Sequence, residues 1–109
     1  MDDKTLLERA ARAAGLKPDE AMWHPRAGFV WVKRVDGIRT ENAWNPLHDD
    51  GDEARLEGAL CFNVTWGMAS VTVDMSTERY NDHNGDKQKA RRYAGVRAAA
   101  AIGSAHEAQ

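Results

Sequence analysis

The sequence predicts an α+β fold: a four-stranded antiparallel sheet flanked by helices. Apolar residues recur at helical spacing near residues 6–14, 50–60 and 90–102, and two stretches between them read as strand hairpins. The element order is therefore helix, hairpin, helix, hairpin, helix. Because the middle helix must connect the hairpins, we expect one domain over residues 1–109 with helices on both sheet faces, an α-β-α sandwich.

The first helix is marked at both ends. Asp2 or Asp3 can cap its start, and Gly15 ends it in a Schellman-type turn. Pro18 then prevents the helix from resuming, so residues 17–27 are expected to form a loop. The apolar stripe of this helix comprises Leu6, Leu7, Ala10, Ala11 and Ala14.

The first hairpin follows this loop. Residues 29–35 are rich in β-branched and aromatic side chains, which favours a strand. Asp36-Gly37 predicts a two-residue type I′ turn, because both central residues need positive φ. The second strand should run from Ile38 toward Trp44, and Asn45 ends it because the residue before a proline is kept extended.

The middle helix, residues 50–60, begins in a cluster of acids. Asp50 and Glu53 have the spacing of a capping box, and carboxylates at a helix start interact favourably with the helix dipole. The acids do not follow the alternating pattern of a calcium loop, so we expect helix capping here and no metal site.

The second hairpin alternates apolar and polar residues on either side of Gly67-Met68. Phe62, Val64 and Trp66 precede this turn, and Val71, Val73 and Met75 follow it. Residues 76–85 then read as a polar loop. Asp86 can cap a last helix that stops near Gly103, and the tail, residues 104–109, is expected to fray.

Composition narrows the class of protein. Apolar residues make up 42% and charged residues 29% of the chain, with a net charge of −2, as in a globular domain. No apolar run is long enough to span a bilayer, and we expect no signal peptide. Cys61 is the single cysteine, which favours a reducing, cytoplasmic location. Its place beside an apolar strand predicts a small buried side chain.

Catalytic patterns are absent from the sequence. The histidines are scattered and Cys61 has no partner at zinc spacing; phosphate-loop, dinucleotide and nucleophile-elbow patterns are missing as well. We therefore expect no cofactor and favour a protein that is not an enzyme. A small hydrolase or metal-dependent enzyme around His48, which adjoins Asp49, is the third-ranked hypothesis.

Charge is unevenly distributed. Residues 49–57 hold five acids, whereas residues 87–97 carry only basic charge. Ion pairs between these helices, or a solvated face, are favoured over nucleic-acid contact, because only Tyr93 is present to stack on bases. The candidate nucleic-acid residues are Lys87, Lys89, Arg91, Arg92 and Arg97.

Trp23 lies in a proline-bounded loop, where an exposed ring would suggest a protein-binding anchor. Packing beneath the loop is the favoured alternative. In that case the predicted contact surface is the polar face of the second hairpin, which bears Asn63, Thr65, Thr72 and Asp74.

Three segments resemble a known family. They are Leu6-Leu7-Glu8-Arg9-Ala10-Ala11-Arg12-Ala13-Ala14-Gly15, Trp44-Asn45-Pro46-Leu47 with Asp49-Asp50-Gly51-Asp52, and Ala90-Arg91-Arg92 with Arg97-Ala98-Ala99-Ala100. Together they resemble the phage ABA sandwich domain family of small phage and prophage proteins. In relatives the middle helix is typically aliphatic after the acids, whereas Glu57-Gly58 interrupts that pattern here.

The resemblance implies origin and fold, and it brings no established activity. We expect a small phage- or prophage-encoded accessory protein in the cytoplasm of the bacterial host. It would act by binding a host or phage protein. A nucleic-acid-associated factor using the basic C-terminal helix is the alternative, and a homodimer is compatible with either hypothesis.

Overall fold

A computed structural model describes the backbone of residues 2–107 and the side chains of residues 2–105. This part of the chain forms three α-helices and two separate three-stranded antiparallel sheets. The α+β class is confirmed. The prediction of one four-stranded sheet between helices is wrong, because the two hairpins never share an edge.

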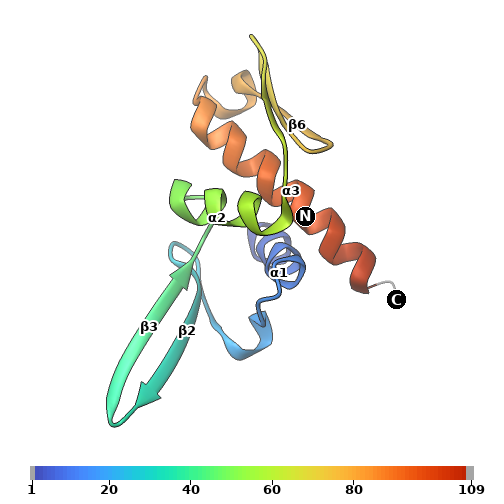
Figure 1. Cartoon of the computed structure of the whole chain (residues 1–109). Coiled ribbons are helices and arrows are strands. Elements are labelled where there is room, and N and C mark those ends of the chain that lie inside the picture. Colours follow the sequence, from blue (N-terminus) through green and yellow to red (C-terminus); the bar gives the residue numbers. More distant parts are fainter. Residues whose placement is uncertain (1, 108–109) are drawn as a thin grey trace.

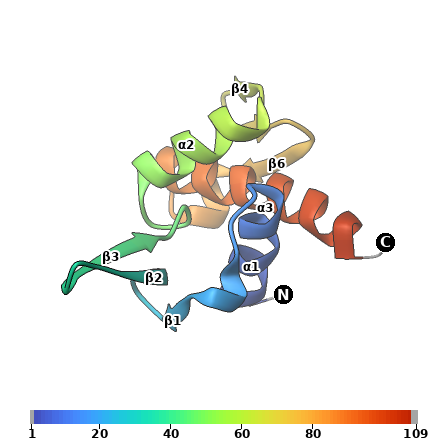
Figure 2. The ribbon, with the colours of Figure 1, turned by 60° about the horizontal axis from the view of Figure 1, so that its bottom comes forward.

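Helix α3 (Lys87–Glu107) is the centre of the structure. Helices α1 (Asp3–Ala13) and α2 (Asp50–Leu60) both pack against it, and the second sheet lies along it (Figures 1 and 2). Their shared core has small side chains on α3, which let the helices approach closely. The buried members of this core are Leu6, Leu7, Ala10, Phe29, Leu47, Leu56, Val96, Ala99 and Ala100.

The ends of α1 confirm the sequence prediction. The Asp2 carboxylate accepts a hydrogen bond from the Thr5 amide at 2.8 Å, so Asp2 is the N-cap. Gly15 has a φ of 81°, and the Leu16 amide donates to the Ala11 carbonyl at 2.9 Å. These bonds satisfy carbonyl groups that the helix end would otherwise leave unpaired.

The end of α3 differs from the prediction. The helix continues past Gly103 to Glu107, so residues 104–107 are helical rather than frayed, and residues 108–109 lie outside the described part of the chain. Gly103 is buried against α1, where a Cβ atom would overlap the Arg9 carbonyl oxygen. This glycine permits helix–helix contact and does not terminate the helix.

Sheet A contains β1 (Met22–His24), β2 (Gly28–Val35) and β3 (Ile38–Trp44) in chain order. Asp36 and Gly37 have φ values of 53° and 77°, as the predicted type I′ turn requires. Strand β1 was expected to be loop. It lies beyond a short 3-10 helix, η1 (Pro18–Glu20), and is too short to be recognised without its pairing partner in β2.

Sheet B contains β4 (Val64–Trp66), β5 (Ser70–Val73) and β6 (Ser76–Arg79). Strand β6 corrects the predicted polar loop, because the segment is polar along its whole length yet pairs with β5. Met75 was expected on the apolar face but is exposed in the β5–β6 turn. A 3-10 turn, η2 (Tyr80–His83), leads into α3.

The two sheets occupy different places relative to α3. Sheet B lies along α3, whereas the β2–β3 hairpin projects away from the helices (Figure 1). Helix α2 connects the end of β3 to the start of β4, and the two hairpins it joins form separate sheets.

Candidate functional site

The cap of α2 lies one residue earlier than predicted. The Asp49 carboxylate accepts a hydrogen bond from the Asp52 amide at 2.8 Å, so Asp49 replaces Asp50 as the N-cap. Asp50 instead pairs with Arg92 of α3, with Oδ1 and Nη1 2.7 Å apart. Glu53 is buried, so the Asp50–Glu53 capping box is not formed.

The segment before α2 is a structural junction. The Asn45 amide donates to Asp52 Oδ2, and Asn45 Nδ2 donates to the Arg26 carbonyl, each at 2.9 Å. Arg92 Nε donates to the Leu47 carbonyl at 2.8 Å. Pro46 and Leu47 are fully buried. This motif therefore joins sheet A to α2 and α3, which explains its distinctive residues without invoking chemistry.

A buried ion-pair network links α2 to α3. Arg91 donates from Nε and Nη2 to the two carboxylate oxygens of Glu57, at 2.9 and 2.7 Å. Its Nε also lies 3.4 Å from Glu53 Oε2. Gly95 makes room for Glu53, since a Cβ atom there would overlap Glu53 Oε1. The interruption of the aliphatic pattern at Glu57 is thus explained by its pairing with Arg91.

The two carboxyl groups of this network titrate differently. Burial, followed by the nearby Glu57 carboxylate, raises the pKa of Glu53 to about 9. Burial also disfavours ionised Glu57, but hydrogen bonds from Arg91 and with Glu53 outweigh it and lower the pKa of Glu57. At neutral pH the coupled pair therefore retains one proton between its two carboxyl groups.

A perturbed carboxyl group can indicate an acid–base centre, but this one is closed to substrate. Only 1% of the Glu53 side chain is exposed. Among the described residues, no group of three or more His, Cys, Asp or Glu side chains is arranged to hold a metal ion. The network's evident role is to hold α2 against α3.

The predicted nucleic-acid residues do not form one basic stripe. Arg91 and Arg92 point into the contact with α2, and Arg97 lies 3.7 Å from Glu78 of β6. Lys87 and Lys89 lie over the rings of Tyr80 and Tyr93, at 5.4 and 6.0 Å from the ring centres. Ion pairing with α2, favoured from the sequence, accounts for the two central arginines.

The remaining candidate residues for chemistry are isolated. His48 is exposed before α2, and its amide donates to the Asn45 carbonyl at 3.0 Å. Cys61 was expected to be buried but is exposed. Cys61 is the C-cap of α2, with a φ of 56°, and β4 begins only at Val64, so Cys61 does not lie beside the strand as predicted.

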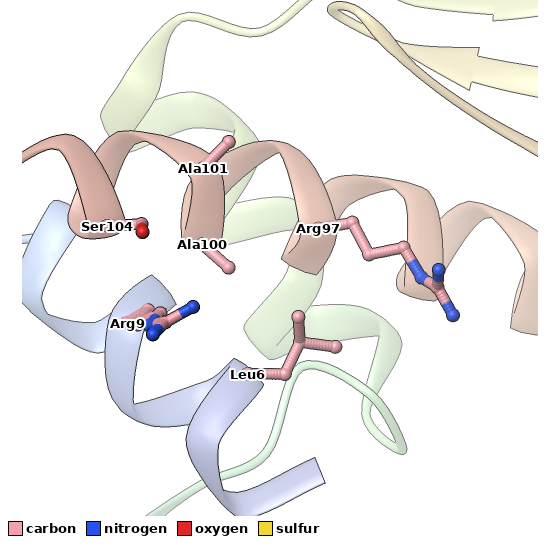
Figure 3. A pocket seen from close by; sticks show the side chains of 6 residues that line it. All are labelled: Leu6, Arg9, Arg97, Ala100, Ala101 and Ser104. Carbon is pink, nitrogen blue, oxygen red and sulfur yellow. The ribbon is translucent and has the colours of Figure 1, made fainter. Parts of the chain in front are cut away.

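A hollow of about 400 Å³ lies between α1 and α3 (Figure 3). Arg9 and Arg97 line it together with Leu6, Ala100, Ala101 and Ser104. The lining residues include no histidine or acid, so Ser104 has no base beside it there.

Trp23 packs in the structure, as favoured from the sequence. Its ring is half-buried and meets Phe29 edge to face, with ring centres 5.1 Å apart. Phe29 is itself a buried core residue. Trp23 therefore packs against the core through Phe29.

Thr65 and Thr72, two of the predicted contact residues, lie on one face of sheet B, and Asn63 and Asp74 flank the strands that carry them. Thr65 lies opposite Thr72, and the Asp74 amide donates to the Asn63 carbonyl at 2.8 Å. Thr77 of β6 extends the row, with its Oγ1 2.8 Å from that of Thr72. Thr77 was missed because β6 was not expected to be a strand.

The β4–β5 end of sheet B also exposes large apolar side chains. Trp66 remains 47% exposed at the end of β4, and Met68 in the turn is completely exposed. Trp66 is paired with Val71, so its side chain lies on the face opposite to Thr65 and Thr72 and is exposed only because it is at the end of the sheet. We call Asn63, Thr65, Thr72, Asp74 and Thr77, with Trp66 and Met68 at the β4–β5 end, the sheet B surface.

A second exposed region is the β2–β3 hairpin beyond its base. Residues 32–42, which we call the arm, are exposed on both faces of the hairpin. Val35 and Ile38 at its tip are 62% and 66% exposed. In Figure 1 the arm and sheet B lie at opposite ends of the molecule.

Comparison with known proteins adds no relative. No protein-family model, curated protein or solved structure matches this chain. Within residues 2–107, no helix combines the length and apolar character needed to cross a membrane.

Proposed function

We propose that this is a small phage- or prophage-encoded accessory protein that binds a host or phage protein through the sheet B surface. The observation that carries the proposal is the uncovered row of Thr65, Thr72 and Thr77 on one face of sheet B, with the exposed Trp66 and Met68 at the β4–β5 end of the same sheet. The family resemblance supports the phage origin. The single cysteine supports a location in the bacterial cytoplasm.

The sheet B surface has the composition of a contact site. Tryptophan and methionine are enriched at protein interfaces, where a few large side chains provide most of the binding energy. Threonines lose little side-chain entropy on binding and can donate or accept hydrogen bonds. The surface therefore combines apolar anchors at one end with an adaptable polar face.

The test uses exposed side chains on and away from sheet B. Met68→Ala and Trp66→Ala should each abolish capture of the partner from a phage-infected host lysate, detected by mass spectrometry. Met22→Ala is the matched control, because Met22 is also exposed but lies in β1 of sheet A. If all three variants, each folded by circular dichroism, retain the same captured protein, the sheet B surface is not its binding site.

The nucleic-acid alternative receives less support, because Arg91 and Arg92 are engaged with α2 and Leu47. We expect weak or undetectable DNA binding at physiological salt. Any binding that does occur should fall steeply with added salt, since neutralised phosphates release counterions. Sequence-selective binding that persists at high salt would favour this alternative over protein binding.

A further inference from the structure

The outer edge of β3 is open. Strand β2 pairs with its inner edge from Ile38 to Trp44, and no other described strand pairs with β3. In an antiparallel hairpin closed by a two-residue turn, alternate residues direct their backbone groups toward the partner strand. The N–H and C=O groups of Ile38, Thr40 and Asn42 therefore face β2, and those of Arg39, Glu41 and Ala43 face outward.

The charges along this edge are opposite in sign and two residues apart. Arg39 Nη2 lies 2.7 Å from Glu41 Oε1, and both side chains are about half exposed. Arg39 also lies directly opposite Arg34 of β2. Because like charges at directly opposed positions destabilise a sheet, the isolated arm leaves Arg39 in an unfavourable cross-strand pair.

We propose that a second copy of this chain pairs antiparallel with β3 through the arm, with the two-fold axis at Thr40. In this register Arg39 of each copy lies opposite Glu41 of the other. The two arms then form a continuous sheet across the dimer, as in other cases of strand addition at a free edge.

The backbone and the charges select the same register. Arg39 and Glu41 carry outward-facing backbone groups, so each Arg39–Glu41 pair across the dimer exchanges main-chain hydrogen bonds as well as opposite charges. Moving the axis to Arg39 would oppose two arginines, and moving it to Glu41 would oppose two glutamates. Only the axis at Thr40 makes both pairs complementary.

The opposite face of the arm gains from the same arrangement. Ile38 becomes the neighbour of Asn42 of the second copy, and Trp31 lies across from Asn42 in each hairpin. Ile38 is thus partly covered by Asn42 of the second copy, whereas Val35, one strand farther from the seam, stays exposed. The contact is a narrow strip, so we expect reversible, concentration-dependent association rather than an obligate dimer.

This proposal is independent of the sheet B surface. The arm and sheet B lie at opposite ends of the molecule (Figure 1), so a chain can dimerise whether or not it binds a protein through sheet B. Dimerisation would present two sheet B surfaces to a partner, which raises the strength of binding to any repeated target.

The test is a charge swap followed by sedimentation velocity between about 1 µM and about 1 mM protein. The parent should shift from monomer to dimer over this range. Arg39→Glu leaves acids at both positions and Glu41→Arg leaves bases at both, so each variant alone should remain monomeric. An equimolar mixture of the two should dimerise, because every cross-dimer pair then joins opposite charges.

Lys33→Glu is the matched control, because it makes the same charge change as Arg39→Glu on β2, away from the seam. This variant should dimerise like the parent. A parent that stays monomeric, single variants that still dimerise, or a mixture that does not associate would each overturn the proposal. So would an arm that binds DNA through Arg39 while the protein stays monomeric. Circular dichroism confirms that each variant is folded.

Discussion

Sheets A and B have the same topology but opposite environments. Each is a three-stranded antiparallel meander in chain order. In sheet B, Val71 and Val73 are completely buried against α3, whereas Val35 and Ile38 of the arm are mostly exposed. The β-branched pattern is similar in the two places, and the difference lies in whether a helix covers the strands.

The comparison separates folding from function. A hairpin with no cover is only marginally stable in water, so the arm gains little from its own side chains. Its base is held by Phe29 and Trp44, which pack in the core, and by the strong Asp36-Gly37 turn. Sheet B belongs to the core and bears the proposed contact surface on its free face, whereas the proposed dimer contact lies on the arm.

The largest expected difference is in packing. Val71→Ala should lower the free energy of unfolding by about 2 kcal/mol, because it removes buried methyl groups and leaves a cavity. Val35→Ala should change it by less than about 0.5 kcal/mol, because that side chain is exposed. Urea unfolding of the two variants measures both values, and equal losses would remove the distinction between the sheets.

The next effect is the pH dependence of the core. The folded-state pKa of Glu53, about 9, lies above its ordinary value of 4.5, so the folded state binds the extra proton. This stabilisation is complete below the ordinary value and is lost as pH rises toward about 9. Glu53→Gln should flatten this slope, raising stability at high pH by about 1 kcal/mol or more.

The pH effect also distinguishes the two regions. Because Glu53 joins α2 to α3, raising the pH should weaken the hydrogen-exchange protection of the β5 amides. The free energy of local opening at the arm amides should not change. The lowered pKa of Glu57 acts in the opposite sense below pH 4.5, where its protonation destabilises the folded state. Urea unfolding at several pH values gives the free energy of unfolding of the parent and of Glu53→Gln. The same dependence of that free energy on pH in both proteins would contradict the account.

The smallest effects are expected at the start of α2. Asp49→Ala should destabilise the protein by about 1 kcal/mol through loss of the N-cap. Asp50→Ala should have a smaller effect, because its carboxylate is 61% exposed and loses one ion pair with Arg92. Thermal unfolding of the two variants shows which substitution destabilises the protein more. A larger loss of stability for Asp50→Ala would indicate that Asp50 is the N-cap, as predicted from the sequence.

Local signals were read correctly from the sequence. The turn at Asp36-Gly37, both flanking strands and the caps of α1 and α3 depend on neighbouring residues, and all were predicted. Strands β1 and β6 were missed because they are stabilised by pairing with β2 and β5, whereas their own composition does not indicate a strand. The run of adjacent acids before α2 could not show which carboxylate would reach the free amide.

Part of the candidate surface could also be predicted. The alternation in β4 and β5 correctly grouped Thr65 with Thr72, but Thr77 required knowledge of β6. The charge distribution predicted ion pairs between α2 and α3, but it did not predict that Glu53 and Glu57 are buried beside Arg91, 34 residues beyond Glu57. Gly95 was the available signal, since a glycine within a helix often marks a close neighbour.

Native-state hydrogen exchange tests the contrast between the sheets most directly. At a protein concentration low enough to keep the chain monomeric, the Val71 and Val73 amides of β5 should exchange only by global unfolding. The Lys33 and Thr40 amides of the arm should exchange by local opening, with much weaker protection and little dependence on denaturant. Equal protection in the two sheets, or arm amides that follow global unfolding, would contradict the account.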